Sequence, residues 1–449
     1  MEVHLIAIGV LVLAFLVGIT RGVNLGAAAL IGGGAVVLLL TGGGLDQLYA
    51  AFPADLFVLL VGVTFLFGIA TVNGTIEWIV DALGRAVGGR ASAIPWVLFF
   101  VAGVVTSLGA LAPVVVGLVA PIGMRLAKRH AISSRLAGLM ILHGASCGNF
   151  SPVNLLGATV NSTLDRAGLE PAPVALFVAN VGYNIVLGVV IYLMFGGLEL
   201  LRRERSQVME QVESRTRVIA TAGAAASTSA NADQPQERTG QTGDTPVADG
   251  ERLDPIKGLT LAIIVAVGAT AMIGKIDLGI LALSAGVLLT IVAPKSSADG
   301  GKRIAWNVVL LITGVVTYVG LLNEIGTIQF VGDAANRLGS PLATAFIICL
   351  IGAVVSAFAS SAGIIAVLIP LAMPFLLSGD ISVIGMAIAI TISSTVVDST
   401  PFSTIGAIAL SNADPEDRDY TYRGFLGWGA LMVVTAPIVT MLFVLPGLG

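Results

Sequence analysis

The chain has 449 residues, of which 56% are hydrophobic and only 11% are charged, and its mean hydropathy is +0.96. A soluble domain of this length cannot bury so much apolar surface, so the composition excludes that class and predicts an all-α polytopic membrane protein. The net charge of -4 is small, and most charges fall in loops and tails where they mark topology, so we expect no nucleic-acid partner.

Apolar stretches in the first half approach or reach the roughly 20 residues that cross a bilayer as a helix. The first one has no basic segment before it and no small-residue cleavage pattern ahead of Arg21, so we predict a spanning helix and not a secretory signal. The stretches are Leu5–Ile19, Leu25–Leu40, Leu56–Ala70 and Val174–Phe195.

Between Leu201 and Lys257 the chain becomes polar and rich in Ala, Ser, Thr and Gly, with too little apolar surface to favour a packed fold. We therefore predict a flexible linker over 201–256. It would separate a first membrane repeat at 1–200 from a second one at 257–449.

The two halves resemble each other in sequence. When Gly62–Arg85 is aligned with Gly314–Arg337, an offset of 252, nine of the 24 pairs are identical. Further along, an offset of 249 aligns the polar segment Asn149–Ala158 with Asp398–Ala407. Matched Pro, Gly and polar residues at one offset indicate an internal duplication and not a chance likeness between apolar helices.

Each half is expected to hold two spanning helices, a third helix, a short amphipathic segment, a re-entrant hairpin, a broken helix and a final helix, or about five transmembrane elements. We predict amphipathic segments at Ile76–Gly88 and Ile328–Leu338. Hairpins are predicted at Ala93–Met124 and Leu342–Phe375, because Ser, Gly and Pro interrupt both stretches.

Charge indicates that the two repeats have inverted topology. The loop after the first hairpin is basic, whereas its counterpart at 376–382 has no Lys or Arg and contains Asp380. The basic residues are Arg125, Lys128, Arg129 and Arg135. By the positive-inside rule the two loops face opposite sides, which places the N-terminus outside and the linker in the cytoplasm.

The aligned polar segments are candidate binding sites. A Pro inside a membrane helix frees backbone groups, and opposed half-helices can offer N–H groups to an anion and carbonyls to sodium. Because Lys and Arg are absent from the predicted hairpins and breaks, an anion would be bound by hydroxyls, amides and backbone groups. The residues expected to bind substrate are Ser151, Pro152, Asn154, Ser360, Ser361, Thr400, Pro401 and Ser403.

Asp398 is the most informative single residue, because a carboxylate in an apolar segment is costly and marks an ion path or a paired charge. We interpret it as a sodium ligand or proton carrier. His143 is a second, weaker candidate for carrying protons, since a lone helical His more often hydrogen-bonds a neighbour. The Gly144–Gly148 segment matches the G-x-S-x-G pattern around Ser146, but close helix packing explains its small residues better than an intramembrane serine hydrolase.

With these residues the chain resembles the ion transporter superfamily, in particular the divalent anion:sodium symporters and, over its N-terminal half, the MatC-like malonate and dicarboxylate carriers. In that family a Ser-Asn-Thr signature lies at each hairpin tip and a Thr-Pro-Pro-Asn-like break follows. Ser360-Ser361-Ala362 occupies the second tip and Thr400-Pro401-Phe402-Ser403 the second break, while Ser151-Pro152-Val153-Asn154 occupies the first break. The first tip departs from the pattern, because Leu111-Ala112-Pro113 has no polar side chain.

The resemblance implies a secondary transporter that imports a small dicarboxylate such as malonate or succinate with sodium, by an elevator-type motion. It further implies an inner-membrane homodimer without catalytic residues. A sodium/proton antiporter of the same superfamily is the alternative. The sodium candidates are Ala112, Ser146, Asn149, Ala362, Thr395 and Asp398.

Overall fold

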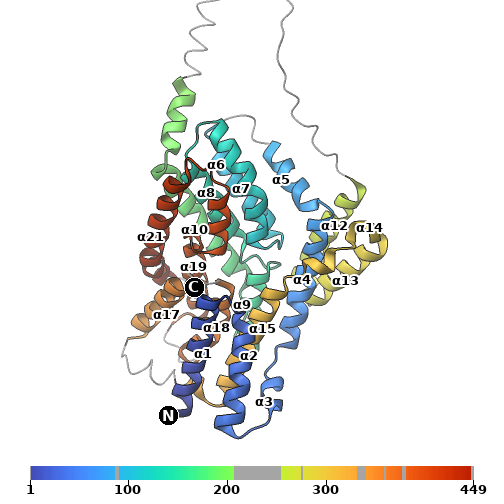
Figure 1. The fold of residues 1–449 in the computed structure, drawn as a ribbon, viewed down its shortest axis with the longest axis vertical. Coiled ribbons are helices and arrows are strands. Elements are labelled where there is room, and N and C mark those ends of the chain that lie inside the picture. Colours follow the sequence, from blue (N-terminus) through green and yellow to red (C-terminus); the bar gives the residue numbers. More distant parts are fainter. Residues whose placement is uncertain are drawn as a thin grey trace, which may run out of the picture.

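The computed structural model describes residues 2–85, 91–206, 254–274, 277–330, 340–357, 361–376 and 381–445. Within these residues every regular element is helical, which agrees with the predicted fold class (Figure 1). The first half comprises α1 (Glu2–Arg21), α2 (Leu25–Val36), η1 (Val37–Thr41), α3 (Leu45–Ala50), α4 (Ala54–Val72), α5 (Thr75–Arg85), α6 (Ile94–Ser107), α7 (Ala112–Arg129), α8 (Ser134–Gly148), α9 (Leu155–Arg166) and α10 (Pro173–Met194).

The second half follows the same order. It comprises α12 (Pro255–Gly274), α13 (Leu278–Val292), α14 (Pro294–Ser297), η2 (Gly300–Arg303), α15 (Trp306–Glu324), α17 (Pro341–Ser356), α18 (Ser361–Leu376), α19 (Val383–Thr395), η3 (Val396–Ser399), α20 (Thr404–Ser411) and α21 (Arg418–Val444). The second predicted amphipathic segment lies largely outside the described residues.

The distribution of apolar side chains shows that lipid surrounds this fold. By length and composition, five segments of the described chain can cross a membrane: Ala54–Val72, Pro173–Met194, Trp306–Glu324, Val383–Ser411 and Arg418–Val444. Large aliphatic side chains on other helices point outward, with Ile31 76% and Leu39 80% exposed. The chain is therefore a multi-pass membrane protein.

The first hairpin consists of α6 and α7, and its turn is formed by residues 108–111. Gly109 has φ +115°, and a Cβ atom there would lie 2.5 Å from the Phe67 ring, so the turn requires glycine. Pro121, which sequence reasoning counted among the interruptions, lies inside the continuous helix α7. The second hairpin has the same form in α17 and α18, and residues 358–360 of its turn lie outside the described residues.

Both predicted helix breaks are present, between α8 and α9 and between α19 and α20. Each break folds back on the helix that follows it. A Cβ atom on Gly157 would lie 2.3 Å from the Ser151 carbonyl oxygen, and one on Gly406 would lie 1.9 Å from that of Thr400. The two aligned glycines therefore permit the same close backbone approach in each half.

Contacts between the halves are reciprocal. Helix α2 packs on α15 while its aligned counterpart α13 packs on α4, and α7 packs on α20 while α18 packs on α9. Close glycine contacts join Gly26 to Gly314 in one pair and Gly62 to Gly279 in the other. Two copies of one repeat related by a two-fold axis produce such reciprocal contacts, so the contacts support the duplication. The side of the membrane that each repeat faces stays a prediction.

The start of the predicted linker differs from the structure. The chain is helical over 197–206, and Glu204 accepts hydrogen bonds from the Ser92 backbone nitrogen at 2.8 Å and from its hydroxyl at 2.6 Å. The local charge content of this helix had suggested a linker, but its Glu204 carboxylate binds Ser92 just before the first hairpin helix. Residues 207–253 of the predicted linker lie outside the described residues.

Candidate functional site

A cavity of about 110 Å³ lies where both hairpins meet both helix breaks. One water needs roughly 10–15 Å³ of such space, so the cavity has room for several waters or a small anion. Its lining comprises Leu111, Ala112, Pro113, Asn149, Asn154, Leu155, Leu156, Val308, Ser361, Ala362, Asp398, Thr404 and Ile405. Residues of both aligned breaks, the candidate binding segments, are thus among those that line this cavity.

The predicted site residues divide into two groups. Six of them line the cavity: Ala112, Asn149, Asn154, Ser361, Ala362 and Asp398. The others lie in the breaks or in the helices before them, outside the lining: Ser146, Ser151, Pro152, Thr395, Thr400, Pro401 and Ser403. Ser360 lies outside the described residues. Their roles in binding stay predictions.

In the first half, the polar side chains of the break hold the hairpin turn. The Asn154 amide donates to the carbonyls of Thr106 at 2.9 Å and Ala110 at 3.2 Å, and its oxygen accepts from the Leu156 nitrogen at 3.0 Å. The Ser151 hydroxyl donates to the Ser107 carbonyl at 2.5 Å. Asn154 is therefore both the N-cap of α9 and the link between break and turn.

The second half repeats this arrangement with hydroxyls. Thr400 donates to the carbonyl of Ala357 at 2.9 Å, which ties the break to the end of α17. Ser403 caps α20 by accepting from the Gly406 nitrogen at 3.0 Å, and it donates to the carbonyl of Asp398. These hydroxyls therefore satisfy backbone groups that the break leaves free, and they fix the shape of the cavity.

Asp398 lies in η3, is 8% exposed and accepts a hydrogen bond of 2.5 Å from the Ser361 hydroxyl. None of the described Lys or Arg residues lines the cavity or forms an ion pair with it. The hydroxyl of Ser356, at the end of α17, is fully buried beside the Asp398 carboxylate. The carboxylate therefore faces oxygens and not cations.

Two sodium candidates form hydrogen bonds outside the cavity. The Thr395 hydroxyl donates back to the Thr391 carbonyl at 2.8 Å, within α19, and its role as a sodium ligand stays a prediction. The Ser146 carbonyl accepts at 2.9 Å from the amide of Asn180, which also donates to the Cys147 carbonyl at 2.9 Å. Asn180 on α10 thus holds the end of α8, and sequence reasoning missed it.

His143 belongs to the same buried network. Its Nε2 accepts from the Trp428 indole at 2.8 Å, so Nδ1 carries the proton and donates to the Asn184 oxygen at 3.0 Å. Both ring nitrogens are thereby engaged in the neutral state, by Trp428 and Asn184. This geometry gives the histidine a structural role.

Four helices begin at the cavity: α7 at Ala112, α9 at Leu155, α18 at Ser361 and α20 at Thr404. The first turn of a helix leaves N–H groups without intrahelical partners, and each N-terminus carries a partial positive charge of about +0.5. The start of α7 has no side-chain cap at all. The cavity can therefore attract an anion without a Lys or Arg side chain.

Two comparisons with known proteins concern the family and the fold. Residues 1–149 match the family described as the N-terminus of the dicarboxylate carrier protein MatC. The fold is similar to the crystal structure of the Alcanivorax borkumensis YdaH transporter, described as having an unusual topology, with a TM-score of 0.56 and 14% identity over 88% of this chain and 87% of that one.

The chain is a transporter. The match confirms the resemblance to MatC-like carriers over the N-terminal third, and the YdaH likeness concerns the fold of the whole chain. No curated protein matches the sequence of this transporter. The carrier-family match and the transporter-like fold disagree with the hydrolase alternative around Ser146.

Proposed function

We propose that the transporter imports a small dicarboxylate, such as malonate or succinate, together with sodium. The observation that carries this proposal is the meeting of four helix N-termini at one cavity, whose described lining contains neither Lys nor Arg. Four partial charges of about +0.5 sum to about +2, which complements a dianion. The MatC match over residues 1–149 supports a dicarboxylate as the substrate.

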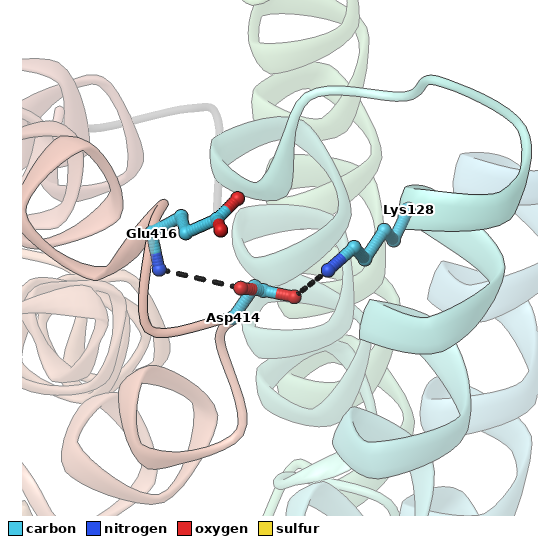
Figure 2. A network of polar contacts seen from close by, with 3 residues as sticks. All are labelled: Lys128, Asp414 and Glu416. Carbon is cyan, nitrogen blue, oxygen red and sulfur yellow. Dashed lines mark hydrogen bonds and ion pairs between the residues drawn. The ribbon is translucent and has the colours of Figure 1, made fainter.

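The four helices form two pairs. Helices α7 and α20 run side by side from the cavity to an ion pair between Lys128 and Asp414 (Figure 2). Helices α9 and α18 also run together, and their later residues Thr163, Arg166 and Pro370 line a second cavity of about 360 Å³. Each pair joins a hairpin helix of one half to a broken helix of the other, so each pair supplies one place for a carboxylate.

Import of a dianion against an inside-negative potential costs about 2.3 kcal/mol per charge per 100 mV, so accompanying cations are required. We place sodium near Asp398, where the Ser361 and Ser356 hydroxyls add oxygen ligands. Three or more sodium ions per dianion would make uptake electrogenic in the favourable direction.

An elevator motion fits the way the cavity is lined. All lining residues except Val308 belong to the hairpins and broken helices, while Val308 lies on α15, which packs with α2 and α4. Sliding the hairpin and broken-helix core along α15 would move the cavity relative to Val308. We further propose an inner-membrane homodimer with an external N-terminus and a cytoplasmic linker.

Uptake of labelled malonate and succinate into proteoliposomes, with and without an inward sodium gradient, tests this function. We expect uptake of at least one acid that depends on the gradient. No uptake of either acid or of a close analogue would refute the proposal.

A second candidate function is a sodium/proton antiporter. The observation that favours it is the buried carboxylate of Asp398 in the cavity. This function predicts a sodium-driven pH change in vesicles that lack any organic anion. The dicarboxylate proposal predicts no such change.

A further inference from the structure

The position of Asp398 has a consequence for how substrate and cation are coupled. Ser361 is the first residue of α18, its hydroxyl is bonded to Asp398 at 2.5 Å, and both side chains line the cavity. The Asp398 carboxylate thus lies at the opening of the α9–α18 pair, while the Asp398 carbonyl accepts from Ser403, the N-cap of α20. An anion bound at the start of α18 therefore meets the negative charge of this carboxylate.

We propose that Asp398 makes dicarboxylate binding conditional on a cation. Without a cation, the Asp398 carboxylate repels the substrate carboxylate that approaches the α9–α18 pair. A monovalent cation held by Asp398, with the Ser361 and Ser356 hydroxyls beside it, removes this repulsion and attracts the substrate. Asp398 then acts as the coupling residue, and the dependence on the cation arises at one end of the substrate.

The contrast with the first half supports this assignment. Asn149 is the aligned counterpart of Asp398 and also lines the cavity, but its amide is neutral. At the first residue of its second helix, the first hairpin has Ala112, which carries no hydroxyl, whereas the second hairpin has Ser361. Asp398 is the one acidic residue in the described lining, so the charge-based coupling belongs to the second half.

The inference rests on the proposed dicarboxylate function and is tested separately from it. Binding of labelled succinate and malonate to the purified full chain is measured by equilibrium dialysis across a sodium titration. In the wild type, removal of sodium should weaken binding by about 5- to 150-fold, the usual range for coupled sites, and sodium affinity should rise by the same factor when substrate is bound. If the wild type binds neither acid at any sodium concentration, the proposed function itself fails.

The decisive variant is Asp398→Asn, which keeps the shape of the side chain and removes its charge. We expect this variant to bind the dicarboxylate without sodium, with an affinity close to that of the sodium-saturated wild type. Asp165→Asn removes an exposed carboxylate at the far end of α9 and should keep the full sodium dependence. Retained sodium dependence in Asp398→Asn, with substrate still bound, would overturn the inference.

Two further measurements keep the proposal testable if Asp398→Asn does not fold. The Ser361→Ala variant leaves the carboxylate in place, so its binding should still depend on the cation. In the wild type at pH 8, the logarithm of the dissociation constant should fall with the logarithm of sodium concentration below saturation, and a flat line would overturn the inference. Repeating the titration at pH 6 shows whether a proton can replace sodium, which would identify the proton as an alternative cation at Asp398.

Discussion

Substitution of Asn154 tests whether the break holds the first hairpin. Asn154→Ala would leave the Thr106 and Ala110 carbonyls without their donor and would remove the cap of α9. Each unpaired buried carbonyl costs about 1 to 3 kcal/mol and the cap about 1 kcal/mol, so the variant should lose roughly 3 to 7 kcal/mol of stability.

Asn154→Asp separates the two roles of this side chain. The carboxylate can still cap α9, but it cannot donate to the two carbonyls and would repel them. We therefore expect it to be at least as destabilising as Asn154→Ala, although Asp is as good an N-cap as Asn.

Thermal unfolding of the purified variants in detergent, followed by tryptophan fluorescence, measures these changes. Asn307→Ala is the matched control, because that side chain is exposed and should change the midpoint little. Wild-type stability in Asn154→Asp would refute the link between break and hairpin.

Three further predictions concern other parts of the transporter. Gly406→Ala should lower the unfolding temperature and abolish uptake, because its Cβ atom would meet a backbone oxygen at 1.9 Å, whereas Gly427→Ala in open space should do neither. Val308→Trp should fill the cavity and stop uptake with little loss of stability, which comparison of transport and unfolding would show. The hydrogen bond from Lys128 lowers the pKa of Asp414, so this pair stabilises the protein above the unfolded-state pKa of Asp414 and loses that effect as pH falls through the lowered folded-state value. Unfolding midpoints measured from pH 6 to pH 3 should therefore converge for wild type and Lys128→Gln, and a constant gap would contradict this account.

The sequence predicted the architecture well because its strongest signals are periodic or repeated. The apolar stretches indicated the spanning helices, and the duplicated Pro and Gly residues indicated the two helix breaks. Duplicated proline and glycine residues act through the backbone, so their effect on the local fold can be inferred without knowing their neighbours.

The partners of the polar side chains could not be predicted in the same way. Ser151 and Thr400 bond to carbonyls 44 and 43 residues away, and the hydroxyl chemistry is the same for a substrate ligand as for a structural link. Val308 has no polar signal that would mark a cavity wall. Asn180 and Asn184 could have been found, since two amides one turn apart in an apolar membrane helix indicate a buried polar network.

The most direct test of the central claim is equilibrium binding of labelled succinate to the purified transporter in saturating sodium. The four helix N-termini predict saturable binding of one dianion per chain, displaced by malonate but much less effectively by the monocarboxylate butyrate. Equal displacement by butyrate, or no binding of either dicarboxylate, would contradict the claim that these N-termini form a dianion site.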